Sequence, residues 1–179
     1  LFFSILLITV MISLGRFNFT QARYESDPTH QKKQTITFFL VDVTNQSGQI
    51  KLEGIIPRVE PYLFTFEVSN FDATRHADVD LTYSTEIITT TNMHLNFKIF
   101  KGSNMNLDEI DSDTITTDDN GVYYRHLVID GASTMNYAND VTDEYTLWVE
   151  FPLSYKNNPN DYAGIIDLVD IKINAEQVV

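Results

Sequence analysis

The residue types that commonly carry chemistry are present in this 179-residue chain, but their spacing matches no known catalytic motif. No two histidines have the H-E-x-x-H spacing of a zinc protease. No serine lies in a G-x-S-x-G nucleophile elbow, and cysteine is absent, which excludes thiolate nucleophiles and zinc sites built on sulfur. The sequence therefore predicts no catalytic, cofactor-binding or metal-binding residue, and a protein that is not an enzyme. The four histidines, expected at surface or strand positions, are His30, His76, His94 and His126.

Two acidic stretches resemble fragments of a calcium-binding loop. Asp111-Ser112-Asp113 is followed by Asp118-Asp119-Asn120-Gly121, but Ile115 stands where an EF-hand needs a third oxygen ligand. We therefore interpret residues 107–121 as an exposed acidic loop or hairpin, and leave weak calcium binding there open.

The charge and the composition narrow the class of protein. There are 25 acidic and 12 basic residues, giving a formal net charge of −13. Such a surface repels phosphate groups, so we expect no nucleic-acid partner. Secreted eukaryotic proteins of this size often carry disulfides, so the lack of cysteine fits an exported bacterial or archaeal protein.

The first 22 residues look like a targeting segment. Residues 1–14 (LFFSILLITVMISL) contain no charge, and the run is shorter than the roughly 20 residues that span a bilayer. Its length is that of a signal-peptide core, and Thr20-Gln21-Ala22 offers a cleavage site. We expect residues 1–22 to be a signal-peptide-like hydrophobic segment; a buried element of the mature protein or a retained anchor are the alternatives. The polar residues 23–34 read as a flexible lead-in or donor segment.

The remainder, residues 35–179, has the alternating pattern of β-strands. In Glu144–Phe151, for example, Tyr145, Leu147 and Val149 lie on one side and Trp148 on the other. We interpret Trp148 as packed by a loop or a second sheet, with an exposed binding face as the alternative. The expected strands lie at 35–43, 49–55, 61–70, 77–90 (with a bulge), 94–100, 122–129, 144–151 and 163–175, with loops at 107–121, 131–143 and 155–162.

This spacing predicts an all-β protein, a jelly-roll-like β-sandwich of about eight or nine strands that follows the N-terminal hydrophobic segment. A length of 179 residues fits one domain plus a targeting segment, so residues 35–179 are expected to form one domain.

Several segments, taken in order, resemble the TasA/camelysin family of exported bacterial proteins. The hydrophobic segment runs into Ala22–Asp27, and Phe64–Asn70 (FTFEVSN) follows a strand that ends in proline. Tyr83–Phe100 is similar to the family's long strand, turn and following strand, and Tyr162–Asp167 to the lead into its last strand.

The resemblance implies a jelly roll, export with removal of the signal, and a secreted, extracellular structural subunit of fibres at the cell surface or in the biofilm matrix. Its partners would be copies of itself, assembled into filaments, and other matrix proteins. We expect head-to-tail assembly, in which residues 23–34, or the more apolar residues 1–15 if retained, add a strand to a sheet edge of the next subunit. The alternatives are a cell-surface metalloprotease of the camelysin type and a monomeric adhesin or carbohydrate-binding module.

Overall fold

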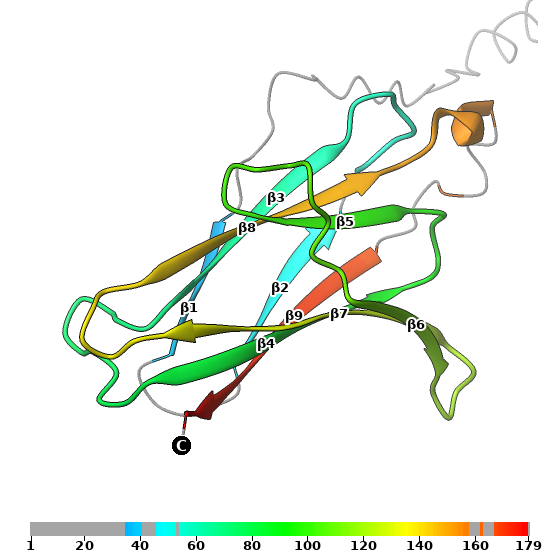
Figure 1. Cartoon of the computed structure of the whole chain (residues 1–179). Coiled ribbons are helices and arrows are strands. Elements are labelled where there is room, and N and C mark those ends of the chain that lie inside the picture. The colour runs from blue at the N-terminus through cyan, green and yellow to red at the C-terminus, as the bar shows by residue number, and fades with distance from the viewer. Residues whose placement is uncertain (1–34, 41–45, 53, 158–161, 163–166, 179) are drawn as a thin grey trace, which may run out of the picture.

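The structure is a computed structural model that describes residues 35–40, 46–52, 54–157, 162 and 167–178. The described residues form two β-sheets packed face to face (Figure 1), which confirms the predicted all-β sandwich. The expected signal-like segment 1–22 and lead-in 23–34 lie outside the described residues. Within the described part, no helix has the length and apolar character needed to cross a membrane.

Among the described residues, nine strands make up the two sheets, and about eight or nine strands were predicted. The four-stranded sheet, sheet A, has the order β1 (Thr35–Phe39), β3 (Tyr62–Ser69), β8 (Thr142–Glu150), β5 (Asn96–Lys101). The five-stranded sheet, sheet B, has the order β2 (Gln46–Leu52), β9 (Asp167–Gln177), β4 (Leu81–Thr90), β7 (Tyr123–Met135), β6 (Ser112–Thr117). One short 3-10 helix, η1 (Leu153–Asn157), follows β8, where a loop was expected to begin.

The strand order is that of a jelly roll with one strand out of place. A jelly roll is a long antiparallel hairpin rolled over, so its first strand pairs with its last and its second with the next to last. With β1 set aside, β2 pairs with β9, β3 with β8 and β4 with β7, all antiparallel. The remaining strand, β6, should then lie beside β5, but it pairs with β7 instead. The added strand β1 runs parallel to β3 at the edge of sheet A.

The alternating sequence pattern produces the core between the sheets. Every second residue of β4 is buried, from Leu81 to Thr89, and the intervening side chains are partly exposed. On the buried face of sheet A, Phe66 stacks on its cross-strand neighbour Tyr145 at 4.9 Å between ring centroids, and Phe38 packs edge-on against Phe66 at 6.3 Å. Burial of each such aromatic side chain stabilises the fold by roughly 1.5–3 kcal/mol. Packing of these inward-facing side chains therefore fixes the positions of the strands.

A polar cluster joins the two sheets at one end of the sandwich. The Tyr83 hydroxyl, from sheet B, donates to Asp143 Oδ2 at 2.5 Å and lies 2.7 Å from the Tyr145 hydroxyl. Lys101 Nζ lies 2.9 Å from Asp143 Oδ2 and completes the cluster. Burial raises the pKa of Tyr83 far above its usual value, so the phenol remains a proton donor.

One predicted loop is wrong. Residues 131–143 were expected to be a loop, but β7 continues to Met135 and β8 begins at Thr142. The strand continues because β7 regains its pairing with β4 after an irregularity, with Tyr83 opposite Ser133 and Thr85 opposite Ile129. One residue of β4 therefore lies opposite three residues of β7, so β7 carries two extra residues. A bulge was predicted within 77–90, but the extra residues belong to β7. Along β4 itself, buried and partly exposed residues alternate without interruption.

Candidate functional site

The displaced strand β6 leaves the sandwich open on one side. All six of its residues are exposed, because in the part of the chain that the structure describes sheet A ends at β5 and no strand lies opposite β6. Figure 1 shows the β6–β7 hairpin projecting beyond the two layers. The space between β6 and the start of β5 is the place that a regular jelly roll fills with a strand.

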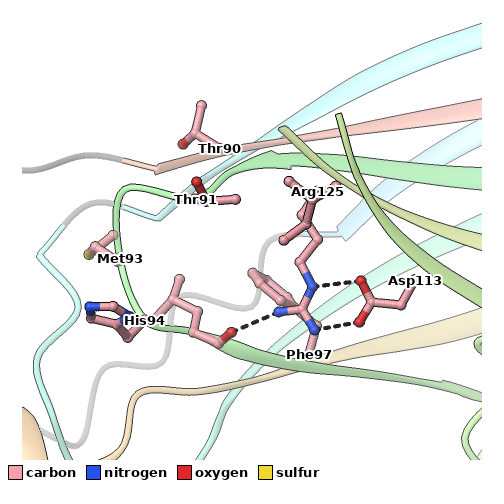
Figure 2. A pocket seen from close by; sticks show the side chains of 9 residues that line it. Thr90, Thr91, Met93, His94, Phe97, Asp113 and Arg125 are labelled. Atoms are coloured by element: carbon pink, nitrogen blue, oxygen red, sulfur yellow. Dashed lines mark hydrogen bonds and ion pairs between the residues drawn. The ribbon is translucent and has the colours of Figure 1, made fainter. Parts of the chain in front are cut away.

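This space is a groove of about 380 Å³, shown in Figure 2. Its walls come from the β4–β5 connection, from the start of β5 and from the face of β6 and β7 that turns toward them. The wall is part apolar and part polar: four apolar side chains lie beside two threonines near the end of β4, one histidine and one ion pair. The lining residues are Thr90, Thr91, Met93, His94, Leu95, Phe97, Asp113, Ile115 and Arg125.

Arg125 is the only arginine or lysine in this lining, and its charge is already paired. Its Nε donates to Asp113 Oδ1 at 2.8 Å and its Nη2 to Oδ2 at 2.5 Å. Its Nη1 donates to the carbonyl oxygen of Leu95 at 3.0 Å, and the guanidinium lies 5.5 Å from the Phe97 ring centroid. The hydrogen bonds from Arg125 lower the pKa of Asp113. The guanidinium is therefore not available to bind an anion in the groove.

The free edge of β6 carries unpaired backbone groups next to the groove. Asp118 N donates to Val122 O in the turn that follows β6. Counting back by twos, Thr116 and Thr114 turn their backbone groups toward β7, while Ile115 and Asp113 turn theirs to the free edge. β6 is the last strand of its sheet, and within the described residues no strand pairs with this edge. An added strand would find backbone partners here and place alternate side chains in the groove.

The flank of β5 is covered over only part of its length. Glu109 N donates to Ile99 O at 2.8 Å, and Ile99 N donates to Asp108 Oδ1 at 3.0 Å. The connection between β5 and β6 therefore occupies the middle of the β5 edge. The groove lies at the other end of β5, near Leu95 and Phe97.

The histidines lie apart in the structure, and one of the four, His30, lies outside the described residues. His76 Nε2 is 2.8 Å from Asp140 Oδ1, and His94 stacks on Tyr155 at 4.7 Å between ring centroids. His126 contacts Glu86 and lies on the outer face of sheet B. Among the described residues, no group of three or more histidine, aspartate or glutamate side chains is arranged to hold a metal ion.

The acidic stretch 107–121 forms the projecting hairpin, one of the two forms predicted for it. Its carboxylates have other partners: Asp113 binds Arg125, and Asp111 Oδ2 accepts a hydrogen bond from Asp130 N. Asp118 Oδ1 accepts hydrogen bonds from the backbone N–H groups of the following turn, which lowers its pKa. These carboxylates stabilise the hairpin.

Trp148 lies on the outer face of sheet A and is partly exposed. It stands in register between Leu63 of β3 and Lys98 of β5, and Lys98 Nζ lies 5.3 Å from the ring centroid. It was expected to be packed by a loop or by the second sheet, and instead its cover comes from neighbours within its own sheet.

No protein-family description and no curated protein matches this chain in sequence comparisons. The resemblance to the TasA/camelysin family therefore stays a prediction. Sequence reasoning also missed the groove, because its walls come from segments up to 35 residues apart and Arg125 and Phe97 belong to different sheets. The available signal was the run S-D-T-I-T-T at 112–117, whose β-branched residues favour a strand.

Proposed function

We propose that this protein is a secreted structural subunit of an extracellular fibre, which assembles head-to-tail when an N-terminal strand of one subunit enters the groove of the next. The observation that carries the proposal is the open edge of β6 beside a groove with four apolar side chains in its wall. An exposed, unpaired strand edge is a template for strand addition unless charge, proline or a covering element protects it. β6 contains no proline and no lysine, and its one charged side chain, Asp113, is paired with Arg125.

The groove suits a strand for two separate reasons. The edge of β6 offers backbone hydrogen bonds, which give affinity without regard to sequence. The walls formed by Met93, Leu95, Phe97 and Ile115 accept apolar side chains at every second position of the incoming strand. Ile115 is 62% exposed in the monomer, so burial beneath a strand would remove apolar surface from water.

The charge distribution supports donation by the N-terminal lead-in. Residues 23–34 contain three basic and two acidic residues, a net charge of +1. The whole chain carries −13 and Arg16 contributes +1 within residues 1–22, so residues 35–179 carry −13 − 1 − 1, or −15. A slightly basic segment is attracted to such an acidic body, and this attraction offsets part of the repulsion between subunits. Residues 1–15, if retained, would instead supply the apolar side chains that the groove favours.

Two variants, each of which replaces an exposed aliphatic residue with lysine, test the proposal. Ile115→Lys places a charge in the groove, whereas Val59→Lys places it at a loop position that is 72% exposed and outside the groove lining. We expect wild type and Val59→Lys to form filaments by negative-stain electron microscopy, and Ile115→Lys to remain a monomer in sedimentation velocity. Because Ile115 is exposed, the melting temperature of the Ile115→Lys monomer should stay close to that of wild type.

The two parts of the proposal fail differently. If Ile115→Lys forms filaments as readily as Val59→Lys, the groove is not the acceptor. If the wild type is monomeric at every concentration and pH tried, the fibre function is wrong, and an adhesin or a metalloprotease becomes the better hypothesis. Deletion of residues 23–34 then separates the two donors, since filaments that persist would point to residues 1–15.

A further inference from the structure

Three side chains on the outer face of sheet B form a chain of hydroxyl, imidazole and carboxylate. Thr116 Oγ1, on β6, lies 2.8 Å from His126 Nε2, on β7. His126 Nδ1 lies 2.7 Å from Glu86 Oε1, on β4. These strands are neighbours in the order β4, β7, β6 (Figure 1). Glu86 stands opposite Val128 and Thr116 opposite Tyr124, so the three side chains run diagonally across the sheet, with His126 in the middle.

The two nitrogens of His126 have distinct roles in this arrangement. An ionised carboxylate only accepts hydrogen bonds, so Glu86 takes the proton on Nδ1 as its partner. In the neutral ring, Nε2 is then left as an acceptor, facing the Thr116 hydroxyl. A hydroxyl within reach of a base that a third group orients is the arrangement of an activated nucleophile. The second oxygen of Glu86 lies 3.9 Å from Lys172 Nζ, which holds the carboxylate from the side of β9.

The Thr116 hydroxyl is accessible from solution. Asp113 and Ile115 turn toward the groove, so Thr116 turns to the opposite face of the projecting hairpin, and it is exposed. The side chains of His126 and Glu86 are 22% and 27% exposed, so they are held in place and still reachable. The position is an open sheet face, which suits a single transfer to Thr116 better than repeated turnover of a bound substrate.

We propose that Thr116 is an acylation site, a threonine that His126 activates to accept an acyl group from an activated ester or thioester. The Thr116 oxygen attacks the acyl carbon while its proton passes to His126 Nε2. The bond between the acyl carbon and the leaving oxygen or sulfur then breaks, and His126 returns the proton to the leaving group. The product is an ester on Thr116 and a free alcohol or thiol, with no oxidant or cofactor consumed.

The test uses the full chain and p-nitrophenyl acetate, with peptide mapping by mass spectrometry. Acetylation adds about 42 Da to the peptide position that acts as the nucleophile. Thr114 is an internal control, because it lies on the same strand and the same face and is also exposed. General-base catalysis contributes a factor of about 10² or more, so we expect Thr116 to be labelled roughly a hundredfold faster than Thr114.

Two variants complete the test. Thr116→Val keeps the side-chain shape and should lose the label at this position. His126→Ala should slow labelling of Thr116 to the rate seen at Thr114, while circular dichroism and sedimentation confirm that the sandwich is retained. Equal labelling of the two threonines in wild type, or undiminished labelling of Thr116 in His126→Ala, would overturn the proposal. Neither result requires filament formation, because the label is located by peptide mapping.

Discussion

Asn70 is the buried polar residue whose loss should be most informative about stability. It follows β3 and is fully buried. Its Nδ2 donates to Asn136 O at 3.0 Å and to Asn139 O at 2.9 Å, and its Oδ1 accepts from Val141 N at 2.8 Å. One side chain therefore holds the connection between β7 and β8, which joins sheet B to sheet A.

The expected cost of Asn70→Ala follows from these three hydrogen bonds. Each contributes about 0.5–1.5 kcal/mol net, for a total of about 1.5–4.5 kcal/mol. Asn136 and Asn139 are exposed, so water can hydrogen-bond to the backbone carbonyl groups that lose the Asn70 amide as a partner. We therefore expect Asn70→Ala to lower the free energy of unfolding by about 2–3 kcal/mol, and the melting temperature by roughly 4–12 °C for a domain of this size.

The assay is urea unfolding followed by tryptophan fluorescence, with the slope of the transition checked for constancy. Asn96→Ala is the matched control, because its exposed amide makes one hydrogen bond, to Glu150, and should change stability by less than about 0.5 kcal/mol. Asn70→Asp should cost at least as much as Asn70→Ala, since a carboxylate would face two carbonyl oxygens. An Asn70→Ala midpoint equal to that of Asn96→Ala would refute this account of the connection.

Two further predictions concern single polar groups. Thr85 is buried, and within the described residues its Oγ1 has no hydrogen-bond partner; Thr85→Val should therefore raise the free energy of unfolding by about 1 kcal/mol in the same assay, and a loss would show that the hydroxyl is satisfied in solution. The carbonyl of Ala77 and the carboxylate of Asp140 raise the pKa of His76 above 6.5. The folded state then favours the charged ring, so this stabilisation is complete below pH 6.5 and is lost as the pH rises through the folded-state pKa. Proton NMR should show His76 titrating above 6.5, and Asp140→Asn should lower that value; no change in the variant would exclude Asp140 as a cause.

The sandwich could be predicted from the sequence because most strands have one solvent-exposed face and one buried face. In β8 the alternation of Tyr145, Leu147 and Val149 is complete, and all three are buried as expected. The prediction was wrong at β7, where Gly131 and Ala132 interrupt the pattern. A glycine within a possible strand favours the prediction of a turn from the local sequence. Only the pairing with β4 keeps the chain extended there.

The groove and the Thr116–His126–Glu86 chain could not be predicted in the same way. Thr116, His126 and Glu86 are separated by 10 and 40 residues along the chain, and their contact depends on which strands become neighbours. No periodic pattern encodes strand order. In the sequence these are isolated polar residues on three strands, and the strand order of the sheet brings their side chains into contact.

The groove and the Thr116–His126–Glu86 chain both exist because β6 pairs with β7 and not with β5. The turn between β6 and β7 explains this pairing. Asp118 Oδ1 accepts hydrogen bonds from Asn120 N and Val122 N, and Gly121 adopts a φ of 81°, which glycine tolerates best. This tight turn forms a local hairpin, whereas residues 102–111 separate β5 from β6 by a longer connection with a larger closure entropy. The local hairpin therefore prevails over the jelly-roll position. The same few turn residues open the groove on one face of β6 and place Thr116 beside His126 on the other.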